Sequence, residues 1–236
     1  MKLVRRVIVS VIALGLGAGM FTASASSANA GVDSAVTIKT GDDALATLNA
    51  LVVKGRAPKT GYSRKQFGSP WLDIDRNGCD ARNDVLKRDF VNEVFKASTR
   101  KCKVVGGEWR DPYTGDTYFF DHQPSEVSID HVVALSDAWQ KGAQQFTAAK
   151  RKNFANDPLN LIATSKRVNS QKSDSDAASW LPPNKAFRCN YVARQIAVKY
   201  KYKLWVTQAE AQAMRTVLNK PQCVGTALPN GQDRVS

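Results

Sequence analysis

Asp130 and His131 are neighbours in the sequence, and Asn169 follows in a later segment. An aspartate carboxylate is a hard oxygen ligand that suits Mg²⁺, and the amide oxygen of Asn169 adds a neutral ligand. A histidine has an unperturbed pKa of about 6.5, so His131 can accept a proton near neutral pH. Phosphodiester hydrolysis needs such a base for the attacking water and a cation that neutralises charge on the phosphate. Asp130 and Asn169 are therefore candidate metal ligands, and His131 is the candidate general base.

Lys172 and Glu126 are the next candidates around this group. Lys172 lies three residues after Asn169, so both side chains share one face of a helix, where Lys172 can meet a phosphate. In an extended strand Glu126 points to the same face as Asp130. Glu126 is then either close to the cation or a solvated strand residue, and we favour the solvated position. The chain must bend after Asp130 for His131 to share its site.

Short segments with characteristic spacing surround these residues. They are Asp130-His131-Val132-Val133-Ala134-Leu135, Ala138-Trp139, Gly142-Ala143, Asn156-Asp157, Asn169-x-x-Lys172-x-Asp174 and Trp180-x-Pro182. This pattern resembles the HNH endonuclease superfamily, and more closely its secreted DUF1524-type members. The resemblance covers the chain from about Trp71 onwards and is most specific from Glu126 to Pro182.

The resemblance implies a ββα-metal core, also called a His-Me finger, in which a β-hairpin and a helix hold one divalent cation. It implies that Asp130 and Asn169 bind this cation, for which Mg²⁺ is the first candidate and Mn²⁺ the second. It implies that His131 activates water, and that the products carry a 5′-phosphate and a 3′-hydroxyl. Asn169 stands where the family name has its last histidine, which is a common variant.

The resemblance also points to supporting residues. Asn160 matches the residue that braces the loop carrying the base, and Lys172 completes the expected catalytic set. Asp174, within the same motif, is a candidate contact to a metal ligand or to the substrate. Related secreted sequences carry a segment like Gly78-Cys79-Asp80-Ala81-Arg82, which makes Arg82 a candidate phosphate contact. A surface ion pair is an equally good interpretation of Arg82.

The residue patterns of the segments that must position these residues predict an α+β fold. We expect this fold to be mainly helical, with the ββα-metal core embedded in one domain. Apolar residues recur at helical spacing in several segments, and short alternating runs indicate strands between them. Thr207 and Glu210 form a capping box that opens the last helix. We expect helices over 44–53, 83–101, 136–142, 147–153, 165–178, 185–202 and 207–219, and strands within 104–120, 127–133 and 159–163.

The N-terminus and the cysteines indicate export. Residues 1–30 combine a basic start, an apolar stretch and a small-residue cleavage site, which predicts a signal peptide. We expect residues 31–236 to form a single secreted nuclease domain with its core at 125–182, without a membrane segment and as a monomer. Four cysteines allow three pairings, and we expect two disulfides between nearest neighbours, Cys79–Cys102 and Cys189–Cys223. Zinc is a weaker alternative because the sequence has no C-x-x-C pair.

The formal net charge of +13 requires an anionic partner, and nucleic acid, anionic lipid and acidic wall polymers all qualify. Residues 185–202 and Lys203 carry basic side chains that can neutralise phosphates, with tyrosines that can stack on bases or belong to the core. The sequence contains no motif that reads a DNA groove, so we expect cleavage of DNA, with RNA as a second substrate, and little sequence specificity. The alternative is a non-catalytic basic extracellular protein that binds nucleic acid or wall polymer. A toxin aimed at competitors is a third option.

Two weaker signals remain. Asp73-x-Asp75-x-Asn77-Gly78, followed by Asp84, has the spacing of a calcium loop, but Pro70 and Trp71 leave no helix before it. An Asx-rich turn is the favoured interpretation, and structural Ca²⁺ is the alternative. His122, the second histidine, is either another ligand or a polar strand end, and we favour the strand end.

Overall fold

The computed structural model describes residues 41–121 and 126–235, which lie in one unit of the chain, residues 35–236. These residues form seven α-helices and five β-strands, so the fold is mixed α+β, as predicted. The predicted signal peptide, residues 1–30, and His122 lie outside the described residues. In the described part of the chain, no helix is both long and apolar enough to cross a membrane.

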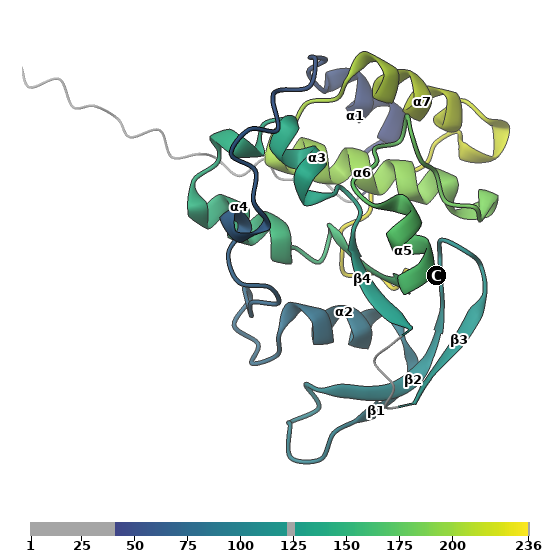
Figure 1. Ribbon diagram of the computed structural model, residues 1–236. Coiled ribbons are helices and arrows are strands. Elements are labelled where there is room, and N and C mark those ends of the chain that lie inside the picture. The colour runs from purple at the N-terminus through teal and green to yellow at the C-terminus, as the bar shows by residue number, and fades with distance from the viewer. Residues whose placement is uncertain (1–40, 122–125, 236) are drawn as a thin grey trace, which may run out of the picture. The chain divides into compact units, whose positions relative to one another are not determined.

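A three-stranded antiparallel sheet forms one end of this unit in Figure 1. Its strands are β1 (Val91–Phe95), β2 (Val104–Arg110) and β3 (Thr117–Asp121), in the order β1-β2-β3. Helix α2 (Ala81–Asp89) begins at Asp80, whose carboxylate accepts a backbone hydrogen bond in the first turn. The helix and the sheet enclose a small hydrophobic core of their own.

The helix predicted over residues 83–101 is wrong in its second half, because the chain turns from α2 into β1. Val91 pairs with Glu108 of β2. Asn92 has a φ of 54°, a left-handed conformation that an α-helix does not contain. Valine and phenylalanine residues at helical spacing also suit a half-buried strand, and here the pairing with β2 decides between the two.

Strands β4 (Val127–His131) and β5 (Leu161–Ser165) pair antiparallel in a second sheet, with His131 opposite Leu161. Helix α5 (Lys166–Lys172) follows β5 directly and packs against both strands. These three elements lie within the predicted core of 125–182. The helix expected over 165–178 ends earlier, because Ser173 adopts a φ of 52° and donates its backbone N–H to the Asn169 carbonyl.

The segment 132–160 is inserted between the two paired strands. It carries helix α3 (Leu135–Gln140) and helix α4 (Ala148–Asn156), close to the predicted 136–142 and 147–153. A short 3-10 helix, Arg64–Phe67, packs against α4 and α3 from the N-terminal side of the chain. The 3-10 helix and the end of the insertion thereby meet around His131.

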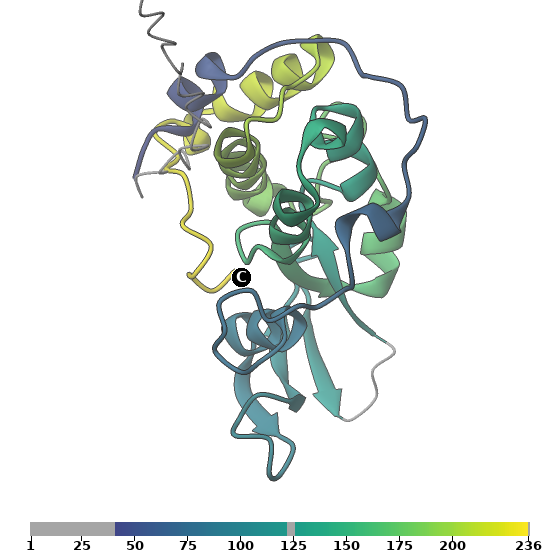
Figure 2. The same ribbon diagram turned by 90° about the vertical axis from the view of Figure 1, so that its left-hand side faces the viewer.

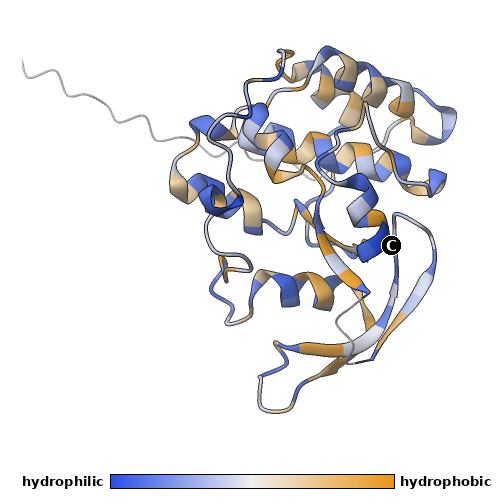
Figure 3. Cartoon of the chain, viewed as in Figure 1, coloured by the Kyte–Doolittle hydropathy of each residue, from blue (hydrophilic) through white to orange (hydrophobic). Residues whose placement is uncertain are grey.

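A helical layer carries the larger hydrophobic core. Helix α1 (Ala44–Ala50) packs on α6 (Arg188–Tyr202) and on α7 (Gln208–Leu218), which opens with the predicted capping box. Figures 1 and 2 show β4, β5 and α5 between these helices and the three-stranded sheet. Apolar and polar residues are mixed along α6 in Figure 3, yet most of this helix is buried.

The burial of α6 corrects the expectation of a substrate-binding surface there. Tyr191 and Lys199 are fully buried, and Arg194 and Tyr202 are nearly so. Arg194 donates to the carbonyl oxygens of Pro158 and Leu159, because no water is available to solvate its guanidinium. Arg194 and Lys199 of α6 thus stabilise the interior instead of facing a ligand, whereas Lys201 is exposed.

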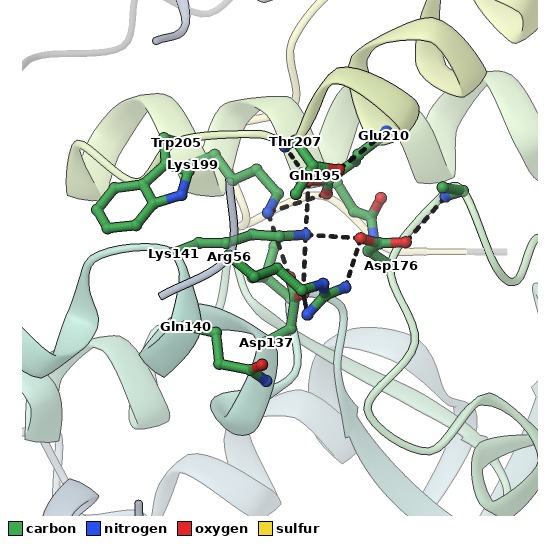
Figure 4. Close-up of polar contacts among 12 residues, drawn as sticks. Arg56, Asp137, Gln140, Lys141, Asp176, Gln195, Lys199, Trp205, Thr207 and Glu210 are labelled. Atoms are coloured by element: carbon green, nitrogen blue, oxygen red, sulfur yellow. Dashed lines mark hydrogen bonds and ion pairs between the residues drawn. The ribbon is translucent and has the colours of Figure 1, made fainter. Parts of the chain in front are cut away.

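Several of these polar residues belong to a cluster that we call the buried ion network, which consists of Arg56, Asp137, Lys141, Asp176, Lys199 and Glu210 (Figure 4). Lys141 Nζ lies 2.8 Å from Asp137, 2.7 Å from Asp176 and 2.6 Å from Glu210. Lys199 Nζ lies 3.0 Å from Glu210. Burial alone would raise the pKa of Asp176, but mainly Lys141 lowers it to about 2. The network joins α3, α6 and α7 to the loop after α5.

Both disulfides join the cysteines predicted to pair. Cys79–Cys102 links the residue before the α2 cap to the β1–β2 connection, and Cys189–Cys223 links α6 to the C-terminal segment. The two cysteines are 23 residues apart in the first disulfide and 34 in the second. Because such a loop restricts the unfolded chain, each disulfide stabilises the fold by about 3–4 kcal/mol.

Candidate active site

Asp130 and His131 are held at the end of β4 by contacts from the opposite side of the inserted segment. Immediately after the strand, Val132 N donates to the Asn160 carbonyl at 2.8 Å. The Asn160 side chain is fully buried and accepts from Val133 N at 2.9 Å, while its Nδ2 donates to the Val133 carbonyl at 3.3 Å. Asn160 therefore fixes the bend after His131 from both of its amide atoms.

The outer edge of β5 is also held by side chains. Ala163 N donates to Asp89 Oδ2 at 3.0 Å, and Ser165 N donates to Asp111 Oδ2 at 2.8 Å. Both carboxylates are buried, so they replace the hydrogen bonds that a further strand would supply. This arrangement fixes β5, and with it the strand that carries His131.

The imidazole of His131 is oriented by a backbone carbonyl. Its Nε2 lies 2.8 Å from the Ala155 oxygen, which can only accept, so Nε2 carries the proton and Nδ1 is the free acceptor. Only 8% of the residue is exposed. Burial, assisted by the positive charges of Arg64 and Lys172, lowers the pKa of His131 to about 3 although the Ala155 carbonyl opposes this change. The ring is therefore neutral at neutral pH, the state in which a histidine accepts a proton.

Asp130 is held by two side-chain hydrogen-bond donors and by the backbone N–H of His131. Lys172 Nζ lies 3.0 Å from Oδ1, and the Tyr113 hydroxyl donates to Oδ2 at 2.6 Å. Burial raises the pKa of Asp130, while Lys172 and Tyr113 act in the opposite direction. A carboxylate has about four lone-pair sites, so these three contacts leave capacity for a cation.

Lys172 occupies a different environment from the one expected for a phosphate contact. Its side chain is fully buried, and its ammonium group contacts Asp130 and the His131 carbonyl at 2.8 Å. It holds the two residues of the Asp-His pair in place at once. Lys172 is therefore a positioning residue in this structure.

Asn169 shares a pocket of about 350 Å³ with Asp130 and His131. Its Nδ2 donates to Ser128 Oγ at 2.7 Å, and its amide oxygen is the atom that could bind a cation. One carboxylate and one amide oxygen suit Mg²⁺, which protein sites usually bind through one or two such groups together with water and phosphate oxygens. No group of three His, Cys, Asp or Glu side chains with metal-site geometry occurs within 41–121 and 126–235. The residues present thus fit a hard divalent cation completed by substrate and water.

The other expected residues separate into two groups. Asp174 lines the same pocket, where it accepts from Ser136 Oγ at 3.0 Å and pairs with Lys59 at 3.1 Å. The hydrogen bond from Lys59 lowers the pKa of Asp174. Glu126 is exposed just before β4 and Arg82 lies on α2, and neither lines this pocket. The structure therefore brings Asp174 to the site and leaves Glu126 and Arg82 outside it.

Three residues at the site were missed in the sequence analysis. Tyr113 reaches Asp130 from the β2–β3 turn, Trp71 stacks parallel to His131 with ring centroids 6.5 Å apart, and Arg64 lines the pocket. Arg64 is exposed and has no ion-pair partner among the described residues. The basic composition of the loop around Arg64 was visible in the sequence, but nothing in it indicated proximity to His131.

The Asp-rich loop near Asp73 is satisfied by its own backbone. Asp73 Oδ2 accepts from Gly78 N at 2.9 Å, and Asn77 Nδ2 donates to Asp75 and Asp84. Burial raises the pKa of Asp84, and the neighbouring carboxylates raise it further. These contacts are those of the favoured Asx-rich turn, and Ca²⁺ binding at this loop remains a prediction.

Comparison with known proteins gives a family and a relative. Residues 80–217 match the family described as the C-terminal domain of GmrSD restriction endonucleases. An "Uncharacterized secreted protein" of Arthroderma benhamiae is 40% identical over 184 residues, which cover 77% of this chain and 86% of that protein. No solved structure matches the chain. The family range contains Asp130, His131, Asn160 and Asn169, whereas Arg64 precedes it.

Proposed function

Because this chain belongs to the family of GmrSD restriction endonuclease C-terminal domains, we propose that it is a metal-dependent endonuclease that hydrolyses DNA. The observation that carries the proposal is the shared pocket of Asp130, His131 and Asn169 at the junction of β4, β5 and α5. A base, a carboxylate and an amide oxygen in one polar pocket supply what phosphodiester hydrolysis requires. We assign the two strands and α5 the role of a ββα-metal core.

In this proposal each residue of the site has its own role in catalysis or metal binding. His131 takes a proton from the attacking water at Nδ1, since Nε2 is engaged with Ala155. Asp130 and Asn169 hold Mg²⁺, with Mn²⁺ as the alternative. The bound cation would neutralise negative charge on the phosphate and on the leaving oxygen.

Other side chains keep these groups in place or meet the substrate. Lys172 and Tyr113 fix the Asp130 carboxylate, and Asn160 fixes the loop after His131. The exposed guanidinium of Arg64 lines the same pocket and is available to a substrate phosphate. The expected products are ends with a 5′-phosphate and a 3′-hydroxyl, formed with little sequence specificity.

We further propose that the protein acts outside the cell. The relative from Arthroderma benhamiae is named as a secreted protein, and disulfides persist chiefly in oxidising compartments. Residues 31–236 hold 31 Lys and Arg against 21 Asp and Glu, and this formal net charge of +10 suits a polyanionic substrate there. A basic protein that binds nucleic acid or wall polymer without cleaving it is the alternative.

Plasmid nicking by the purified, oxidised protein tests this function. We expect conversion of supercoiled to open-circular DNA with Mg²⁺, and complete loss of nicking with excess EDTA, because Asp130 and Asn169 then hold no cation. Agarose gels measure both outcomes, and restored nicking after Mg²⁺ is returned controls for damage by the chelator. Binding without nicking at any divalent cation would favour the non-catalytic alternative.

Tyr113→Phe is expected to raise the Mg²⁺ concentration needed for half-maximal cleavage about tenfold or more, as loss of a partner that orients a metal ligand does. The substitution removes the 2.6 Å hydrogen bond to Asp130 Oδ2 and leaves the ring in the core. Titration of Mg²⁺ in the nicking assay measures the shift. Tyr118→Phe is the matched control, because its hydroxyl makes a weak contact of 3.5 Å to Asp116 at an exposed position. Equal Mg²⁺ requirements for the two variants would contradict the role of Tyr113.

A further inference from the structure

A second pocket adjoins the first on the other side of Arg64, His131 and Leu135, which line both. This pocket has a volume of about 210 Å³, and its lining is mainly apolar. Sites for drug-sized ligands usually measure roughly 300 Å³ or more, so this pocket suits a smaller group. We call it the Trp71 pocket after the aromatic residue in its wall.

The Trp71 ring is placed by the backbone at an energetic cost. Trp71 has a φ of 58°, a left-handed conformation that costs a bulky residue about 1–2 kcal/mol. Leu72 N donates to Asn156 Oδ1 at 2.9 Å, which ties the strained turn to the end of α4. Strain of this kind concentrates at ligand sites, where the surrounding structure maintains it. The half-buried indole lies nearly parallel to the His131 ring, at an interplanar angle of 12°.

Charges at the rim of the Trp71 pocket match a nucleic acid strand. Arg64 and Lys65 are exposed and line its mouth, while Phe67 and Trp71 supply aromatic surface. Cationic groups beside an aromatic platform are the elements with which proteins bind single-stranded nucleic acid. The segment 64–71 also precedes the range that matches the family, so this wall is not part of the matched domain.

We propose that the Trp71 pocket binds one nucleobase of the substrate strand, next to the phosphate that is cleaved. This inference rests on the proposed function and names the substrate class: single-stranded or locally unpaired DNA. The base stacks on Trp71 while the neighbouring phosphate enters the polar pocket past Arg64. A paired base must leave its duplex to enter, so single-stranded DNA is cut faster than duplex DNA. Stacking on a ring does not distinguish the four bases, which agrees with cleavage of low specificity.

The test uses a 5′-labelled oligothymidylate 20-mer with one abasic residue, resolved as a cleavage ladder beside the intact 20-mer. We expect cleavage at a phosphate next to the abasic residue to fall roughly fivefold or more, the loss expected when one stacked base is removed. Trp71→Ala should cut the intact 20-mer more slowly by a similar factor. In the oligomer with the abasic residue, this variant should show no reduced cleavage next to that residue. Trp71→Phe keeps a stacking ring, so it should keep the reduced cleavage next to the abasic residue. This variant controls for general damage to the loop.

A binding measurement in EDTA separates this inference from the proposed function. We expect the intact 20-mer to quench tryptophan fluorescence more than an all-abasic 20-mer does, and Trp71→Phe to remove that difference. A protein that shows the difference but never cuts retains the nucleobase site and loses the proposed function. A uniform ladder around the abasic residue, or equal quenching by both oligomers, would overturn the nucleobase site even if the protein nicks plasmids.

Discussion

Alanine in place of His131 is expected to lower the rate of Mg²⁺-dependent DNA cleavage about a hundredfold to ten-thousandfold, the usual contribution of a positioned general base. Nδ1 of His131 is the only ring nitrogen free to accept a proton, since Nε2 donates to Ala155. Asp130 and Asn169 keep their hydrogen bonds to Lys172 and Ser128 in the variant, so the loss should appear in kcat. Single-turnover nicking of plasmid DNA at saturating Mg²⁺ measures it.

The sequence offers a matched control, because His122 is its only other histidine. His122→Ala should cut at the rate of the unsubstituted protein. Added imidazole should restore part of the activity of His131→Ala, since two pockets lead to the space that the ring vacates. Full activity in a correctly folded His131→Ala protein, with a melting temperature near that of the parent, would refute the assignment of the base.

Methionine in place of Lys141 is expected to destabilise the fold by about 3–5 kcal/mol, the usual cost of removing one partner from buried ion pairs. Lys141 is fully buried and contacts Asp137, Asp176 and Glu210 at 2.6–2.8 Å. Without it, Arg56 and Lys199 are the basic residues that remain paired with these three buried carboxylates in the described part of the chain. For a domain of this size the melting temperature should fall by about 6–20 °C.

The matched control lies in the same network. The Arg56 side chain is 36% exposed and contacts Asp137 and Asp176 at 2.9 and 2.6 Å. Because water screens its charge, Arg56→Met should cost about 1 kcal/mol or less. Urea unfolding monitored by circular dichroism compares the two variants, and an equal or larger loss for Arg56→Met would show that burial does not set the cost.

The elements of the site were predictable where the information is local. Asp130 and His131 lie on a short strand that the alternation of residues indicates, the HNH resemblance adds Asn169, and the structure places all three in one pocket. Local spacing did not fix where the neighbouring elements end. The predicted helix over 83–101 stops at Asp89, and residues 91–95 form a strand because they pair with β2.

Residues that reach the site from distant segments could not be found in the same way. Tyr113 and Trp71 contact Asp130 and His131 across many intervening residues, and no spacing rule connects them. Lys199 of α6 shows the converse, because the sequence suggested that it lies on a basic surface. Lys199 is buried instead, since Glu210 of α7 neutralises it.

The placement of helices α3 and α4 between the two paired strands has a consequence for how the protein folds. A hairpin with a tight turn can close within microseconds, but β4 and β5 must wait until the segment 132–160 has collapsed. Pairings so distant along the chain give slow folding, because the loop entropy is lost before the contacts form. An unfolded chain therefore holds His131 and Asn169 apart, and the two residues meet only after β4 and β5 have paired.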